Sequence, residues 1–210
     1  MNLPAGLSVS SMTGLISGTP TMAGSFDVTL SATNTGGFGE LTLSLQIDPA
    51  PQAISFGAQT SPRTWSAGGT FAINPTANGG ASGNAIVYGS LSSDVCTVSG
   101  TTVTIVTAGS CVISADQAGN ANYAAAPQAT QSVAINAIAP GAPVIGTATA
   151  GNAEATIAFT PPASNGGAAI TSYTATCNPG TVTGTGATSP ITVTGLANGV
   201  SHTCSVTATN

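Results

Sequence analysis

The sequence predicts an all-β protein made of consecutive β-sandwiches, and three observations support this. Apolar and polar residues alternate along many short runs, the period-2 pattern of half-buried strands; in 202–208, for example, Cys204 and Val206 alternate with hydroxyl residues. The 27 glycines and 13 prolines separate these runs, so no longer window sustains a helical period. Because one sandwich takes roughly 100 residues, the 210 residues allow two or three domains.

The composition excludes one class of partner and favours a folded chain. Charged residues make up 3% of the sequence, Arg63 is the only Lys or Arg, and the net charge is -5. Neutralising nucleic-acid phosphates requires clustered lysines and arginines, so we expect no nucleic-acid partner. Since 41% of the residues are apolar, the chain has the hydrophobicity that disordered segments lack.

The four cysteines fall into two local pairs, Cys96 with Cys111 and Cys177 with Cys204. Neither pair has the spacing of a zinc site or of a Cys-X-X-Cys redox catalyst. Structural disulfides are therefore predicted ahead of the alternative, buried free thiols. Disulfides form in oxidising compartments, so we expect an extracellular or cell-surface location.

The first residues do not have the pattern of an export signal, because no basic segment precedes an apolar one. No run of about eighteen apolar residues occurs either, so no membrane span is expected in this segment. A disulfide-bonded chain without its own export signal suggests a segment of a longer secreted protein.

Residues 1–48 form the first predicted domain. Turns at 13–14 and 18–20 separate short strands. The last two strands bury alternate apolar residues, namely Phe26, Val28, Leu30 and Ala32, then Leu41, Leu43, Leu45 and Ile47. The segments 3–8, 13–20 and 23–28 resemble the "putative Ig-like" domain family of large bacterial surface proteins. Members of that family carry further strands before these segments, so the resemblance implies an incomplete first domain.

Residues 49–137 form the second predicted domain, which follows a proline-rich linker at 47–51. Its expected strands are 53–56, 70–74, 85–88, 95–98, 102–106, 111–115 and 131–135. The stretches 94–113 and 117–123 resemble an Ig-like repeat of bacterial extracellular arrays. That resemblance implies a complete domain.

Residues 138–210 form the third predicted domain, after a second linker at 137–143. The segments 155–162, 164–173 and 195–210 resemble a fibronectin type III domain of bacterial type. The resemblance implies strands near 144–149, 153–160, 170–177, 190–194 and 201–209, and a missing last strand. It also makes the strands that carry Cys177 and Cys204 neighbours in one sheet.

Two residues depart from the fibronectin pattern. Phe159 stands where many members have a core tryptophan, which keeps an aromatic anchor but leaves less area to bury. His202 stands where the family has the tyrosine of the corner motif, whose hydroxyl bonds back to the chain. Because an imidazole is shorter than a phenol, the resemblance does not carry that hydrogen bond over to His202.

No catalytic residue, metal site or cofactor is predicted. His202 is the only imidazole, and its strand parity turns it inward, whereas hydrolysis needs a nucleophile, a base and an orienting group together. The six carboxylates are scattered over the three regions. This pattern favours neither paired-carboxylate chemistry nor a calcium site, which takes six to eight oxygen ligands.

Trp65, the only tryptophan, lies close to Arg63 in a stretch rich in proline and glycine. One hypothesis makes these two residues a contact for a sugar or a protein, because tryptophan offers a large area with a polar N–H. The alternative is that Trp65 covers one end of the second sandwich. We favour the alternative, since sugar sites usually hold several aromatic residues and this chain has 4%.

Together these observations predict a structural spacer or stalk segment of an extracellular, adhesin-like bacterial protein, and not an enzyme. Its partners would be the neighbouring domains of the same longer chain and, secondarily, a cell-surface glycan or protein. Two alternatives stay open. One is a carbohydrate- or host-surface-binding module that uses the Trp65 loop or the loop 164–167, and the other is an accessory region of a secreted polysaccharide-degrading enzyme.

Overall fold

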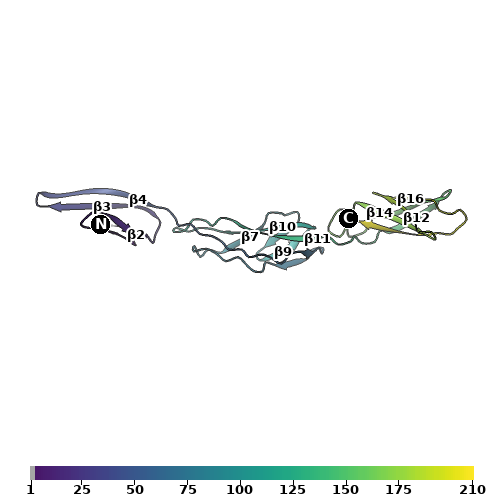
Figure 1. Cartoon of the computed structure of the whole chain (residues 1–210), viewed down its shortest axis with the longest axis horizontal. Helices are drawn as coiled ribbons and strands as arrows, with labels where there is room; N and C mark the ends of the chain where they lie inside the picture. Colours follow the sequence, from purple (N-terminus) through teal and green to yellow (C-terminus); the bar gives the residue numbers. More distant parts are fainter. Residues whose placement is uncertain (1–2) are drawn as a thin grey trace. The chain divides into compact units, whose positions relative to one another are not determined.

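The computed structural model describes residues 3–210, which form strands, turns and loops without a helix (Figure 1). The strands, β1 to β17, belong to six sheets of two to four strands each. The predicted all-β fold class is confirmed.

The chain divides into two compact units. The first comprises residues 1–58, 74–89 and 114–131, and the second comprises 59–73, 90–113 and 132–210. The three predicted domain ranges, 1–48, 49–137 and 138–210, stay a prediction.

The N-terminal segment consists of two antiparallel hairpins. Their strands are β1 (Leu7–Val9), β2 (Ile16–Gly18), β3 (Gly24–Asn34) and β4 (Gly37–Ile47). The long hairpin of β3 and β4 pairs from Gly24 opposite Ile47 to Asn34 opposite Gly37. Its apolar face is unevenly covered, because Val28 is fully buried whereas Leu41, nearer the turn, is 71% exposed.

The middle segment contains two sheets. Its strands are β5 (Arg63–Thr64), β6 (Thr70–Ala72), β7 (Ile86–Ser90), β8 (Cys96–Ser99), β9 (Thr102–Ile105), β10 (Gly109–Gln117) and β11 (Ala129–Asn136). One sheet has the order β5-β11-β10-β7 and the other β6-β9-β8. Alternation buries Val103, Ile113 and Val133 completely.

The expected strand at 53–56 is wrong, and a strand that was not expected is present nearby. In 53–56 only Ser55 pairs, through an isolated bridge to Asn78. The short strand β5 pairs in parallel with the end of β11, so that Arg63 lies opposite Ile135.

The C-terminal segment contains two three-stranded sheets. Its strands are β12 (Val144–Ala150), β13 (Glu154–Thr160), β14 (Ser172–Asn178), β15 (Val182–Gly186), β16 (Ile191–Thr194) and β17 (Thr203–Thr209). The sheet orders are β12-β13-β16 and β15-β14-β17. All five expected strands are present, and β15 is additional.

The core of this segment forms around two aromatic side chains. The rings of Phe159 and Tyr173 lie 4.7 Å apart between centroids, and both residues are at most 6% exposed. Ile157, Ala175 and further buried residues from both sheets complete the cluster. Phe159 is therefore the aromatic anchor that the resemblance to the fibronectin pattern implied at this position.

Candidate functional site

The first disulfide joins two sheets. Cys96 begins β8 and Cys111 lies in β10; they are bonded with their Cα atoms 5.6 Å apart, and both are fully buried. Because β8 and β10 belong to different sheets, the bond fastens the two sheets to each other.

The second disulfide lies within one sheet. Cys177 on β14 and Cys204 on β17 stand directly opposite each other in the register, with Cα atoms 4.1 Å apart. Cys177 is fully buried and Cys204 is half-buried against the core. The bond therefore locks the register of these two strands.

Trp65 follows β5 and belongs to the second compact unit. It is half-buried. Its backbone N–H donates a hydrogen bond to the Asn136 carbonyl at 2.8 Å, and its Nε1–H donates to the Val106 carbonyl at 3.2 Å. The polar group of the indole is thus bonded inside the protein, which leaves the ring for apolar contacts.

The indole ring packs against Gly167, in the loop between β13 and β14 and in the same unit. Gly167 has φ +90°, and a Cβ there would overlap the ring of Trp65. The Ala108 N–H donates to the Gly167 carbonyl at 2.8 Å. The sequence singled out Trp65 and the loop 164–167 separately, and no spacing in it indicated that they meet.

An open groove of about 540 Å³ runs beside Trp65. Its walls include Pro161, Pro162, Ser164 and Asn165, all in the second unit, and none of its lining residues is charged. An uncharged groove with one ring and a few amide and hydroxyl groups is suited to a neutral ligand.

Arg63 does not line this groove. Its guanidinium carbon lies 4.0 Å from the centroid of the Phe71 ring, a cation–π contact. Its Nε is buried and has no hydrogen-bond partner among residues 3–210. Of the two residues predicted to contact a ligand, Arg63 packs inward and Trp65 alone borders the groove.

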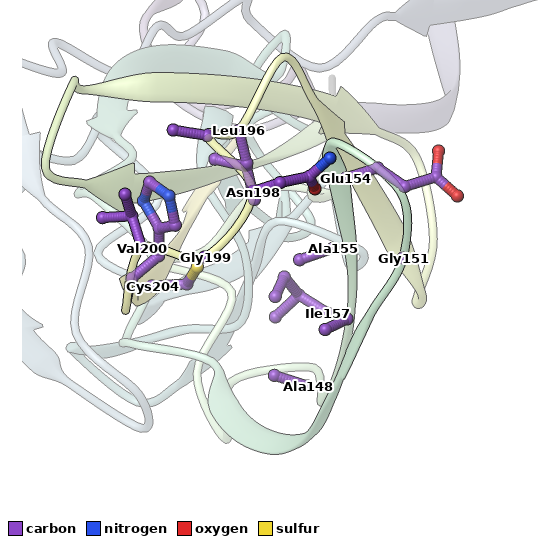
Figure 2. A pocket seen from close by; sticks show the side chains of 13 residues that line it. Ala148, Gly151, Glu154, Ala155, Ile157, Leu196, Asn198, Gly199, Val200 and Cys204 are labelled. Atoms are coloured by element: carbon purple, nitrogen blue, oxygen red, sulfur yellow. The ribbon is translucent and has the colours of Figure 1, made fainter.

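A smaller cleft, of about 210 Å³, opens between β12, β13 and the segment that leads into β17 (Figure 2). Ala148, Ala155 and Ile157 form one side of it, and Leu196 to Cys204 contribute the other. Figure 2 shows the Glu154 carboxylate directed away from Ala155 and Ile157, so the interior of the cleft is uncharged.

His202 lines this cleft, and both of its ring nitrogens are buried without a hydrogen-bond partner among the described residues. The corner hydrogen bond of the fibronectin pattern is therefore not made here. No serine hydroxyl or carboxylate of residues 3–210 forms a hydrogen bond with either nitrogen.

The part of the chain that the structure describes contains no group of three or more His, Cys, Asp or Glu side chains that could hold a metal ion. It also contains no helix of the length and apolarity needed to cross a membrane.

The fold and the paired cysteines define a disulfide-bonded, all-β protein, and one comparison makes that class more specific. Residues 1–48 match the family model described as "Putative Ig domain". That stretch of the chain is therefore similar to this family of Ig-like domains. The comparison with curated proteins gives no match.

Among the solved structures that match is "Crystal structure of domains A168-A170 from titin". The alignment covers 100% of this chain and 79% of that chain, at 20% identity and with a TM-score of 0.35.

Proposed function

We propose that the chain is a non-catalytic spacer segment of an extracellular, adhesin-like protein of a bacterial surface. Its task is to hold neighbouring domains of the same longer chain at a set distance. Two disulfides favour an oxidising, extracellular location. The Ig-like match over residues 1–48 favours a module of the kind that occurs in repeated arrays.

The observation that carries this proposal is the bonded linker in the second compact unit. The Ile138 N–H donates to the Gly166 carbonyl at 3.0 Å. The Asn210 side-chain amide donates to the carbonyls of Ile138 and Asn165 at 2.8 and 2.7 Å. Trp65 packs against the next residue of that loop. A linker held on both sides is stiff, and a spacer needs stiff joins.

Amide ¹⁵N relaxation of the full chain tests this proposal. We expect residues 90–113 and 138–210 to tumble with one correlation time, and Trp65→Ala to shorten that of 138–210 because the ring contact is lost. Trp65→Phe, which keeps a ring but loses the Nε1–H bond, is the matched control and should behave nearly as the wild type. Separate correlation times in the wild type would contradict a stiff spacer.

A binding module is the second candidate function, and the shared groove of Trp65, Ser164 and Asn165 favours it. A neutral glycan could lay an apolar sugar face on the indole while the amide and hydroxyl groups bond its hydroxyls. A glycan array would reveal this function as signals that Trp65→Ala abolishes. If the array gives no signal and residues 90–113 and 138–210 tumble with one correlation time, the spacer function is the one that the experiments support.

A further inference from the structure

We propose that Asn122 is a positioning residue, which fixes the direction in which the hairpin β3–β4 leaves the middle segment. This proposal rests on the spacer function, because a spacer needs fixed directions at its joins. It concerns the first compact unit, whereas the linker that supports the spacer function lies in the second. The two proposals can therefore fail separately.

Asn122 bonds to the chain on both sides of the hairpin. Its side-chain Oδ1 accepts a hydrogen bond from the Ala23 N–H at 3.0 Å, directly before β3 begins. Its backbone carbonyl accepts another from the Ala50 N–H at 2.8 Å, shortly after β4 ends. A single attachment would let the hairpin rotate about the linker. Two attachments, one near each of the paired strands, oppose that rotation.

The attachment at the linker is made by backbone groups. Ala50 forms an isolated parallel bridge with Tyr123, and its carbonyl accepts a hydrogen bond from the Ala124 N–H at 2.9 Å. Replacing a side chain removes none of these groups. The Asn122 side chain adds the attachment at β3, and it does so through an oxygen that a substitution can remove.

The loop that carries Asn122 is braced by the middle segment. The Asn120 Oδ1 accepts a hydrogen bond from the Asn122 N–H at 2.9 Å, and the amide group of the same side chain donates to the Ser82 carbonyl at 3.0 Å. The buried side chain of Gln52 donates to the Ala124 carbonyl at 2.8 Å. Because the loop is held on both sides of Asn122, the acceptor oxygen is presented in a fixed place.

Apolar packing leaves this join partly open. A groove of about 400 Å³ lies here, with Met22, Ile47 and Tyr123 among its lining residues. Met22 is 53% exposed. Segments that share no large apolar interface move relative to each other by default. The hydrogen bonds of Asn122 therefore decide how firmly the hairpin is held.

The chemistry of the contact predicts which replacements keep it. Toward Ala23 the Asn122 side chain acts as an acceptor. Alanine offers no acceptor at this place, whereas aspartate has the same length and carboxylate oxygens that accept an N–H. Asn122→Ala should therefore release the hairpin, and Asn122→Asp should hold it.

Residual dipolar couplings and hydrogen exchange of the full ¹⁵N-labelled chain test the proposal. In the wild type, we expect residues 24–47 to share one alignment tensor with residues 74–89 and 114–131 of the same unit. Asn122→Ala should give 24–47 a tensor of its own and speed exchange of the Ala23 amide about tenfold. Asn122→Asp should restore both, in about 0.15 M NaCl, where repulsion from the exposed Asp48 is weakened.

Two controls separate direction from folding. Asn78→Ala is the matched variant, because Asn78 is an exposed asparagine of the same unit that pairs with Ser55 through its backbone. It should keep one shared tensor. The Ala50 amide bonds to the backbone carbonyl of Asn122, so its exchange reports whether the loop is intact. That exchange should be the same in the wild type and in Asn122→Ala.

Four outcomes would overturn the proposal. They are separate tensors in the wild type, one shared tensor in Asn122→Ala, separate tensors in Asn122→Asp, and faster exchange at Ala50 in Asn122→Ala. The last would show that the side chain maintains the loop and not the direction of the hairpin. None of the four changes the tumbling of residues 90–113 and 138–210, which tests the spacer function by itself.

Discussion

Gly167 meets two requirements that other residue types fail. Its φ of +90° lies in the region that disfavours side chains, and its Cα faces the ring of Trp65. Both requirements come from the same loop, which the Ala108 N–H also holds through the Gly167 carbonyl. The fit of the indole thus depends on a missing Cβ.

We therefore expect Gly167→Ala to destabilise the second unit more than an ordinary left-handed glycine replacement. The backbone strain costs about 1–2 kcal/mol, and the displaced indole adds about 1–3 kcal/mol. Gly100→Ala is the control, because Gly100 has φ +57° and open space around its Cα. Urea unfolding followed by Trp65 fluorescence measures both; equal losses would show that the ring contact contributes nothing.

The sequence predicted the identity of the notable side chains better than their surroundings. That Phe159 is a core aromatic was implied by the resemblance to the fibronectin pattern, and the side chain is indeed buried. That Arg63 lies on Phe71, and not beside a ligand, could not follow, because the contact joins β5 to a strand of a different sheet. The same holds for Trp65 and Gly167, which lie about a hundred residues apart in the sequence.

At the scale of the elements, the two disulfides fasten different parts of the fold. One connects two sheets and the other fixes two neighbouring strands. Each closes a loop within the second unit, with sequence separations of 15 and 27 residues. Removing one disulfide or the other should therefore speed the hydrogen exchange of different sets of buried amides.

We expect the Cys96→Ala/Cys111→Ala pair to lose about 3 kcal/mol and Cys177→Ala/Cys204→Ala about 3.5 kcal/mol, from the loop entropy of the unfolded chain. Hydrogen exchange resolves the two effects, with faster exchange at Val103 in the first variant and at Ile157 in the second. The control is a variant in which all four cysteines are replaced by alanine. Its free energy of unfolding should not change when reductant is added. Free thiols trapped by alkylation of the untreated wild type would contradict both bonds.

Alternation of apolar residues located most strands, and it failed where a strand has little to bury. β9 and β14 follow the period-2 pattern closely. β15, with the sequence VTGTG, was missed because its one large apolar residue, Val182, is followed only by threonines and glycines. The stretch 53–56 has apolar residues in the right places, yet Phe56 is buried from a loop, where its ring lies 5.7 Å from that of Tyr88.

At the scale of the whole molecule, the chain is held together almost without charges. Charged residues are 3% of the sequence, and the one cation is used against an aromatic ring. Stability therefore comes from apolar burial, backbone pairing and the two disulfides.

We accordingly expect the melting temperature to change by no more than about 2 °C between low salt and about 0.5 M NaCl, because there is little charge to screen. Excess chelator should also leave it unchanged, since the described residues form no cluster that could hold a metal. Differential scanning calorimetry measures both. A rise in melting temperature on adding calcium would point to an ion site that joins carboxylates from separate segments.

The disulfide between Cys96 and Cys111 has a further consequence if the chain is pulled from its ends. The residues between the two cysteines cannot lengthen while the bond is intact, which removes about 50 Å of contour at about 3.4 Å per residue. The bond between Cys177 and Cys204 removes about 90 Å more on the same basis. How far the protein can stretch under load is then set by the redox state of its surroundings, and a reductant would release that hidden length without breaking the backbone.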